Sequence, residues 1–498
     1  MYDYDLVLIN PASRKRVYQS LGSELAAIEP PVWCGLMASF VRGKGYRVAI
    51  IDAEAEELSP AETAQRVADM RPRLAAVVAY GHQPSASTQV MPAVGAVSAA
   101  IKALSPQQKV LLLGGHVAAL PQRTLDEEVC DFVAGGEGLY CLIDLIEALS
   151  TAAPDLTKVR DLWRRDGKEV LVGTPAPLVQ NVDQEMPGVA WDLLPMERYR
   201  SHNWHALGHL QRQPYVAVYT TLGCPFKCSF CCIQAPFKSG EAALGIKPTT
   251  NTYRYWSPQR VVDDLEHLQR TYGVRNVKFA DEMFVLNRPH VEGICDEIIR
   301  RKLDLNIWAY ARVDTVKDGM LPKLKAAGFN WLAFGIEAAN ERVRGDVQKG
   351  FDQDDISRTL DKVRAEGIYI IGNYIFGLPE DDLQTMQETL EMAIEQNCEF
   401  ANFYCAMAYP GSPLYQRAIA EGWALPETWG GYSQHAVDTL PLRTKYLTAS
   451  EVLRFRDRAF DAYFTHPSYL AMVEKTFGAA TREHIEGMTS HKLERRYA

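Results

Sequence analysis

Residues 224–231 read CPFKCSFC, and this stretch decides how the rest of the chain is interpreted. It follows a run, Tyr215–Thr221, whose valine, threonine and tyrosine residues favour extended backbone, and Gly223 and Pro225 mark the turn. Three thiols at this spacing can converge from one loop. They suit three irons of a four-iron cluster and leave the fourth iron open, where a small molecule can bind and be activated.

Two other uses of these thiols remain open at this point. A zinc site normally needs four ligands, which Cys232 or a histidine could complete. A disulfide is less favoured, because the ten cysteines of this chain, three of them clustered, fit a reducing cytoplasm better than a disulfide framework. We therefore expect a cytoplasmic protein, and we interpret Cys232 as a spare thiol that packs.

The spacing of the thiols, with Phe230 directly before the last cysteine, resembles the C-x3-C-x-aromatic-C signature of the radical S-adenosylmethionine (radical SAM) superfamily. The resemblance implies that Cys224, Cys228 and Cys231 bind a [4Fe-4S] cluster and that Phe230 packs near the adenine of S-adenosylmethionine. The open iron would chelate the methionine part of that cofactor, and an electron donor such as flavodoxin or ferredoxin would drive release of a 5′-deoxyadenosyl radical.

Length and composition limit the possible classes of protein. A chain of 498 residues should hold two or three domains, and 47% hydrophobic and 23% charged residues are ordinary for a globular protein. The net charge of −9 provides no basic field for nucleic acid or for an anionic membrane. We expect no signal peptide at the start MYDYDLVLIN and no transmembrane helix, because no apolar run reaches 18 residues.

Residues 1–150 alternate short apolar runs with longer segments of helical spacing. The runs predict strands at Tyr4–Asn10, Tyr46–Asp52, Leu74–Tyr80, Val110–Leu113 and Asp131–Ala134. Helices are expected at Val32–Gly43, Pro60–Met70, Thr88–Leu104 and Leu139–Leu149. This alternation indicates a doubly wound, Rossmann-like parallel sheet, which would bind ligands beyond the carboxyl ends of its strands. The G-x-G-x-x-G fingerprint is missing after the first strand, which argues against a nicotinamide site.

Gly-Gly-His follows the fourth expected strand and Gly-Glu-Gly follows the fifth, and this combination resembles the cobalamin-binding domain of one branch of radical SAM enzymes. The resemblance covers residues 1–150 and implies cobalamin as a further cofactor. The candidate contacts stand at the strand ends: Asn10, Tyr80, His82, Gln83, Gly114, Gly115, His116, Gly135, Gly136 and Glu137.

The D-x-H-x-x-G motif, which supplies a histidine to cobalt in other cobalamin proteins, is absent; the first strand is followed by NPASRKRVYQSLG. Cobalamin should therefore bind in its base-off form. The loop of residues 80–84 would lie beneath the ring. His82 could ligate cobalt, or it could remain uncoordinated while Tyr80 or Gln83 blocks water; we favour the second version.

Residues 151–212 are expected to form a linker and bridging segment. Leu162–Leu171, with Asp166-Gly167 as its turn, predicts a hairpin, and several prolines keep the remainder irregular. Residues 213–410 repeat strand and helix six times, with strands at Tyr215–Thr221, Val274–Asp281, Leu305–Val313, Trp331–Ala338, Ile368–Phe376 and Phe400–Ala408. Such a repeat fits a partial (β/α)6 barrel, whose chemistry lies at the carboxyl ends of the strands.

Polar residues at those ends suit the parts of S-adenosylmethionine. Arg312 can pair with the carboxylate of the methionine tail, and Glu337 can accept hydrogen bonds from the ribose. Phe230 and the segment Ile375–Gly377, with Phe376 and Gly377, can form the adenine wall. Many superfamily members carry Gly-Gly-Glu after the second strand. This chain has Ala280-Asp281-Glu282 there, and we expect Asp281 to hold the amino group.

Residues 411–498 are expected to form a small helical cap. Helical patterns run from Ser450 to Phe464 and from Pro467 to Phe477, and the polar tail from Thr481 should be frayed.

The combined hypothesis is a cobalamin-dependent radical SAM methyltransferase. As the resemblance implies, methylcobalamin would supply a methyl group to an unactivated carbon or phosphorus of a small metabolite. Two alternatives remain: a cobalamin-dependent cyclase or rearrangement enzyme, and a cobalamin or iron–sulfur sensor without turnover. No catalytic residue beyond the cofactor contacts can be named from the sequence.

Overall fold

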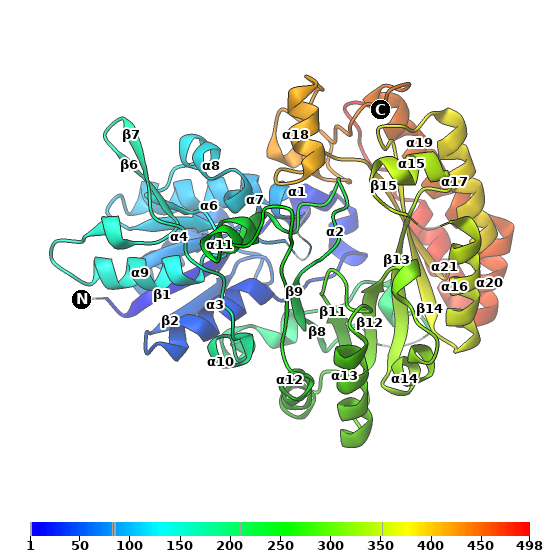
Figure 1. Ribbon diagram of the computed structural model, residues 1–498, viewed down its shortest axis with the longest axis horizontal. Coiled ribbons are helices and arrows are strands. Elements are labelled where there is room, and N and C mark those ends of the chain that lie inside the picture. Colours follow the sequence, from blue (N-terminus) through cyan, green and yellow to red (C-terminus); the bar gives the residue numbers. More distant parts are fainter. Residues whose placement is uncertain (1, 82, 84–85, 209–210, 351) are drawn as a thin grey trace.

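The computed structural model describes residues 2–498, except residues 82, 84–85, 209–210 and 351. Two sheets lie side by side along the long axis of the molecule, with the amino-terminal sheet at the left and the second sheet at the right (Figure 1). Helices pack against both sheets. The chain therefore has the α/β architecture that the alternating strand and helix patterns predict.

The amino-terminal sheet has the strand order β2-β1-β3-β4-β5-β6-β7. The first five strands are parallel, and β6 and β7 add the antiparallel hairpin that the sequence predicted within the bridging segment. The order changes direction between β1 and β3, which is the switch point where doubly wound sheets bind ligands. The strands are β1 (Tyr4–Asn10), β2 (Val48–Asp52), β3 (Pro72–Val78), β4 (Val110–Leu113), β5 (Phe132–Ala134), β6 (Leu162–Asp166) and β7 (Glu169–Val172).

The helices of this half include α3 (Val32–Gly43), α4 (Pro60–Met70), α6 (Met91–Leu104) and α9 (Leu139–Leu149). The segment that we expected to be one helix from Thr88 is divided into α5 (Ala86–Gln89) and α6. Pro92 stands in the first turn of α6, where its missing N–H costs nothing. A proline in that position starts a helix more readily than it continues one.

The second sheet has six parallel strands in the order β15-β14-β13-β12-β11-β8. The sheet forms a half-barrel that stays open between its edge strands β8 and β15, which do not pair with each other in the described part of the chain. The strands are β8 (Tyr215–Val218), β11 (Asn276–Phe279), β12 (Asn306–Ala311), β13 (Phe329–Glu337), β14 (Tyr369–Phe376) and β15 (Phe400–Cys405). The helices between them are α12 (Pro258–Tyr272), α13 (Arg288–Arg301), α14 (Met320–Ala326), α16 (Gln353–Ala365) and α17 (Leu383–Gln396), and they cover the outside (Figure 1).

The strand expected over Tyr215–Thr221 is interrupted, and this break sets the position of the cysteine loop. β9 (Thr221–Gly223) leaves the barrel and pairs antiparallel with β10 (Tyr253–Tyr255). Gly223 has φ +87°, and a Cβ atom there would lie 2.3 Å from the carbonyl oxygen of Thr252. Only glycine fits this turn, which directs the following cysteines over the mouth of the barrel.

The carboxyl-terminal region contains α18 (Pro413–Ala420), α19 (Ala449–Phe464), α20 (Pro467–Phe477) and α21 (Ala479–Thr489). The expectation of a frayed tail after Thr481 is wrong. Helix α21 buries Ile485 and Met488, which are spaced three residues apart, and packs on α20. Beyond α21, Arg495 pairs with Asp457 at 2.9 Å. The polar composition of the tail concealed this short apolar stripe.

Two buried ion pairs join the halves of the molecule. Glu137, after β5, pairs with Arg254 of β10 at 2.6 Å, and Glu29 pairs with Lys278 of β11 at 3.0 Å. All four side chains are at most 10% exposed. The ends of the two sheets are thus fixed against one another beside the cysteine loop. Within the described part of the chain, we find no helix that combines the length and hydropathy needed to cross a membrane.

Candidate functional site

The cysteine loop opens into a large cavity inside the half-barrel, which we call the barrel cavity. Its volume is about 2470 Å³, including space open to solvent, and Cys224, Cys228 and Cys231 all line it. The loop is held from several sides: Asn251 Nδ2 donates to the Phe226 carbonyl at 2.8 Å, and the Leu414 N–H donates to the Ser229 carbonyl at 2.8 Å. The sequence prediction that the three thiols share one site agrees with this geometry.

Three thiols on one loop suit a four-iron cluster, in which each thiolate binds a different iron. Among the described residues, no three His, Cys, Asp or Glu side chains converge closely enough to hold one metal ion. Thiols around a four-iron cluster need not converge on one point, since each binds a different iron. Burial raises the pKa of Cys224 to about 11 and that of Cys231 well above its usual range, so loading a cluster must displace thiol protons.

Arg312 lies beside the thiols, as expected. Its Nε and Nη2 donate to the two carboxylate oxygens of Asp314 at 2.9 and 3.0 Å, while Nη1 lies 3.7 Å from Cys228 Sγ. The guanidinium also stacks over the ring of Phe226, 3.9 Å from its centroid. Asp314 thus fixes one edge of the guanidinium, and the other edge faces the cluster position and the barrel cavity.

Glu337 reaches the same cavity through an irregular strand end. The β13–β14 register shifts between Gly335 and Glu337, and Glu337 itself has φ +68°. Its carboxylate folds back to Lys349 Nζ at 2.5 Å; a Cβ atom on Gly335 would lie 2.7 Å from this carboxylate. A bulge and a non-glycine residue in the left-handed region are features that often occur next to active sites.

Asp281 requires a correction. Its carboxylate is fully buried and accepts hydrogen bonds from the N–H groups of Thr220 and Thr221 at 2.6 and 2.9 Å, so it supports the break between β8 and β9. The next residue, Glu282, lines the barrel cavity instead. Burial raises the pKa of Glu282 to about 8, against the opposing effect of Lys278. The buried and hydrogen-bonded position of Asp281 does not agree with the sequence prediction, and Glu282 becomes the candidate from this acidic pair.

The expected adenine wall is also partly corrected. Phe230 lines the barrel cavity, and so does Ile375. Phe376 lies on the opposite face of β14, where its ring stacks on Phe403 and packs edge-on against Phe455. Gly377 adopts φ +80° and sits against α19, since a Cβ atom there would lie 2.4 Å from Val452. Successive residues of a strand face opposite sides, so Ile375 and Phe376 cannot both face the cavity.

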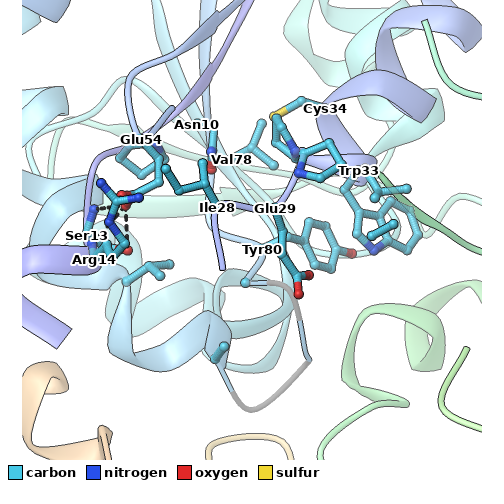
Figure 2. Close-up of a pocket in the computed structure, with 18 of the residues that line it drawn as sticks. Asn10, Ser13, Arg14, Ile28, Glu29, Trp33, Cys34, Glu54, Val78 and Tyr80 are labelled. Carbon is cyan, nitrogen blue, oxygen red and sulfur yellow. Dashed lines mark hydrogen bonds and ion pairs between the residues drawn. The ribbon is translucent and has the colours of Figure 1, made fainter. Parts of the chain in front are cut away.

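A second cavity lies at the switch point of the amino-terminal sheet, and we call it the switch-point cavity (Figure 2). Its volume is about 850 Å³, including space open to solvent. Asn10 and Val78, at the ends of β1 and β3, contribute to it, and Ala217, Tyr219 and Ala280 of the second half close it. This is the place where a doubly wound sheet should bind its ligand.

The expected cobalamin contacts from β1 and β3 reach this region. Asn10 lines the switch-point cavity and donates to Asp52 at 2.8 Å. Tyr80 stacks on Trp33 with ring centroids 4.5 Å apart, and its buried hydroxyl has no hydrogen-bond partner among the described residues. Gln83 lines the barrel cavity and donates to the hydroxyl of Tyr310. His82 lies outside the described residues. An orphaned hydroxyl beside a mixed polar and apolar cleft fits a large ligand with hydrogen-bond acceptors.

The expected contacts after β4 divide into two kinds. Gly115 and His116 line a third cavity, the bridging cavity, which also includes Trp33 and Tyr80. His116 Nδ1 lies 3.1 Å from Thr88 Oγ1, and burial lowers the pKa of His116 to about 3, so the ring stays neutral. Gly114 instead permits close strand packing, since a Cβ atom would lie 2.4 Å from the carbonyl oxygen of Ala79.

The three expected contacts after β5 are occupied by the protein itself. A Cβ atom on Gly135 would lie 2.5 Å from Trp163, and one on Gly136 would lie 2.5 Å from Asp161. The carboxylate of Glu137 is bound by Arg254 and by the Val179 N–H at 3.2 Å. Gly135 and Gly136 therefore permit close packing against β6 and the segment that leads into it, and Glu137 joins the two halves; none of the three lines any of the three cavities.

The bridging cavity shares lining residues with each of the other two cavities and thus lies between them. Trp33, Tyr80 and Tyr219 line both the switch-point and the bridging cavity. Cys232, Ile233 and Glu282 line both the bridging and the barrel cavity. Sequence reasoning placed Ile375 in the adenine wall but did not separate it from Phe376, although the two-residue period of the strand was an available signal. It missed the cavity position of Glu282 and the central position of Trp33; for Trp33, which stands on a helix, we find no signal in the sequence.

Comparison with protein families gives two matches that follow the two halves. The model of the radical SAM superfamily matches residues 218–393, and the model of the B12 binding domain matches residues 18–145. The chain is 27% identical to the uncharacterized methyltransferase PH0819 of Pyrococcus horikoshii, over 93% of both proteins. It is 26% identical to the anaerobic magnesium-protoporphyrin IX monomethyl ester cyclase of Rubrivivax gelatinosus, over 80% of this chain and 68% of that protein.

Among solved structures, the chain resembles TsrM from Kitasatospora setae, a radical S-adenosylmethionine methyltransferase solved with tryptophan and an analogue of S-adenosylmethionine. The TM-score is 0.67 at 16% identity, covering 97% of this chain and 98% of that chain. The same protein has been solved with cobalamin and a [4Fe-4S] cluster. At this level of identity the likeness shows a shared fold.

Proposed function

Because the chain belongs to the radical SAM superfamily and carries an amino-terminal B12-binding domain, we propose that it methylates an unactivated carbon or phosphorus of a small molecule. The family brings three cofactors: S-adenosylmethionine, a [4Fe-4S] cluster and cobalamin. When bound, the first two supply a radical that removes a substrate hydrogen, and cobalamin supplies the methyl group. PH0819, a relative named as a methyltransferase, supports this reaction class.

One observation carries the proposal: the series of cavities from the ends of β1 and β3 to the three thiols. A methyl donor in the amino-terminal cleft and a radical generated at the thiols must reach the same substrate atom. The bridging cavity shares Glu282 and Cys232 with the barrel cavity and Tyr80 with the switch-point cavity. A substrate in the barrel cavity would therefore be accessible from both sides.

We assign the residues around S-adenosylmethionine by charge. The Nη1 edge of Arg312 would bind its carboxylate, and Glu282 would accept from its amino group in place of Asp281. Glu337 would accept from the ribose, while Phe230 and Ile375 would flank the adenine. Each of these side chains lines the barrel cavity, which supports one shared binding place.

The remaining part of the barrel cavity would hold the substrate. Its inner wall is mainly aromatic and aliphatic, with Trp308, Phe400 and Ile371 among the lining residues. Asn402 donates to Asn373 at 2.9 Å, and this amide pair is a hydrogen-bonding element within the wall. A low-potential electron carrier such as flavodoxin or ferredoxin would supply the electron for each radical.

A substrate-free experiment tests the reaction class. The reconstituted enzyme is incubated anaerobically with hydroxocobalamin, reductant and S-adenosylmethionine carrying a deuterated methyl group. We expect the deuterated methyl group on the cobalt of cobalamin, together with some 5′-deoxyadenosine. The variant lacking all three cluster thiols should produce no 5′-deoxyadenosine.

The same experiment separates the alternatives. The cyclase relative makes a cobalamin-dependent cyclase the second candidate, and that reaction needs no methyl group on cobalt. Formation of 5′-deoxyadenosine without a deuterated methyl group on cobalt would favour the cyclase reaction over methyl transfer. Absence of both products would favour a sensor without turnover.

A further inference from the structure

Arg14 is a buried cation at the edge of the switch-point cavity. It begins α1 (Arg14–Tyr18), and its side chain is only 7% exposed. Nη2 pairs with Glu57 at 2.8 Å, and Nε lies 3.5 Å from Glu54 Oε1, but among the described residues Nη1 has no hydrogen-bond partner. Removing a guanidinium from water while leaving its Nη1 donors unused is costly, so the position is suited to an acceptor from outside the chain.

The position of Arg14 is fixed by its neighbours and does not depend on a ligand. Glu54 Oε2 accepts from the backbone N–H groups of Ser13 and Arg14 at 2.5 and 2.8 Å, which anchors the turn after β1. Glu54 Oε1 also lies 3.5 Å from Arg14 Nε. Figure 2 shows Ser13, Arg14 and Glu54 together on one side of the cavity. The N–H donors of Arg14 are therefore held in place before a ligand binds.

A second unused donor lies on the other side of the switch point. Within the described part of the chain the buried hydroxyl of Tyr80 has no hydrogen-bond partner, and Tyr80 lines both the switch-point and the bridging cavity. Its ring is held against Trp33. Arg14 follows β1 and Tyr80 follows β3, so the two donors flank the crevice between the diverging halves of the sheet.

The charges around the cavity indicate a neutral acceptor. Glu29 and Glu54 line the same cavity as Arg14, and Glu57 already pairs with its Nη2. An anionic group would meet these carboxylates as well as the guanidinium. A carbonyl oxygen accepts a hydrogen bond without adding charge. The apolar lining, which includes Ile28, Val32 and Val78, suits a hydrocarbon ring that carries such carbonyls on its rim.

We propose that Arg14 and Tyr80 bind carbonyl oxygens of the amide side chains on the rim of the corrin ring. The corrin is a largely apolar macrocycle bordered by amides, which matches the donors and the lining of the cavity. This inference rests on the cobalamin-binding part of the proposed function. It assigns a binding role to Arg14, a residue that no motif in the sequence indicates.

The test measures equilibrium binding to the full-length, cluster-loaded protein by absorption titration and by co-elution in gel filtration. The ligands are hydroxocobalamin and dicyanocobinamide, which keeps the corrin amides but lacks the nucleotide and its phosphate. The variants are Arg14→Met and Tyr80→Phe. Arg16→Met is the matched control, since Arg16 stands on the same helix but is exposed and lines none of the three cavities. Melting temperature and iron content check that each variant is folded.

We expect Arg14→Met to weaken both ligands ten- to a hundredfold, Tyr80→Phe to weaken both several-fold, and Arg16→Met to change neither. Unchanged binding in folded Arg14→Met overturns the assignment. A loss for hydroxocobalamin alone also overturns it and indicates the nucleotide phosphate as the partner. If Arg14→Met does not fold, Tyr80→Phe decides by the same two ligands. Failure of the wild-type protein to bind either ligand would contradict the proposed function itself.

Discussion

The two sheets carry polar residues at the carboxyl ends of parallel strands, yet the two sets behave differently. At the barrel mouth, Cys224, Cys228, Arg312 and Glu337 all line one cavity. In the amino-terminal sheet, several expected contacts are occupied by the protein, as Glu137 is by Arg254. Thiols and charges with chemistry-specific spacing mark a site directly. Glycines at strand ends do so poorly, because tight packing between strands and loops requires them as well.

The largest expected effect tests the barrel side of this comparison. Replacing Cys224, Cys228 or Cys231 by alanine should abolish the cluster, because each thiolate binds one iron. Cys232→Ala is the matched control, since Cys232 lines the same cavity. Iron and sulfide analysis after anaerobic reconstitution, with paramagnetic resonance of the reduced cluster, gives the measurement. Loss of the cluster in Cys232→Ala with retention in Cys224→Ala would show that the ligand set is misassigned.

The next effect concerns the charges beside the thiols. Arg312→Ala and Glu337→Ala should keep the cluster and weaken binding of S-adenosylmethionine about ten- to a hundredfold, since a charged hydrogen bond contributes roughly 1.5–3 kcal/mol. Calorimetric titration of the reconstituted protein measures this. Arg342→Ala is a control, because that arginine pairs with Glu380 at the surface. Equal affinity in all three variants would mean that other residues hold the cofactor.

Features of the site that follow from local sequence patterns were predictable, and features that depend on how distant segments pack were not. The thiol spacing, the parallel topology and most helix bounds follow from local patterns, such as the Ser59–Glu62 capping box at the start of α4. The errors arose where two adjacent residues fitted the same local pattern. Phe376 and Ile375 are equally apolar, and only strand alternation separates them. The choice between Asp281 and Glu282 depends on a break between β8 and β9 that the sequence does not reveal.

Asp281 and Glu282 provide a sharper test within one acidic pair. Glu282→Gln should weaken binding of S-adenosylmethionine roughly tenfold with little change in melting temperature, because the side chain faces the cavity. Asp281→Asn should leave that affinity close to wild type and lower the stability by about 1–3 kcal/mol, because one amide cannot replace all acceptors for Thr220 and Thr221. Calorimetry and thermal unfolding of the two variants, measured side by side, separate these outcomes. The opposite pattern would restore the sequence expectation for Asp281.

The smallest expected effect tests whether a strand-end carboxyl of the amino-terminal sheet is structural. Asp52, at the end of β2, is 1% exposed and accepts from Tyr199 at 2.7 Å and from Asn10 at 2.8 Å. Burial raises its pKa from 3.8 to about 6, against these hydrogen bonds. The folded protein then holds this proton more tightly than the unfolded chain does. The contribution of Asp52 to stability is complete below about pH 4 and declines as pH rises to about 6.

Asp52→Asn removes this titration and keeps an oxygen acceptor. The melting temperature of Asp52→Asn relative to wild type should therefore increase between pH 4.5 and pH 7 by a few degrees, since a shift of about two pKa units sets an upper limit of about 3 kcal/mol. Scanning fluorimetry of both proteins across that range measures the difference. Binding of hydroxocobalamin should not change, because Asp52 lines none of the three cavities. A pH-independent difference would place the pKa of Asp52 near its ordinary value, and a loss of cofactor affinity would make this strand end part of the site after all.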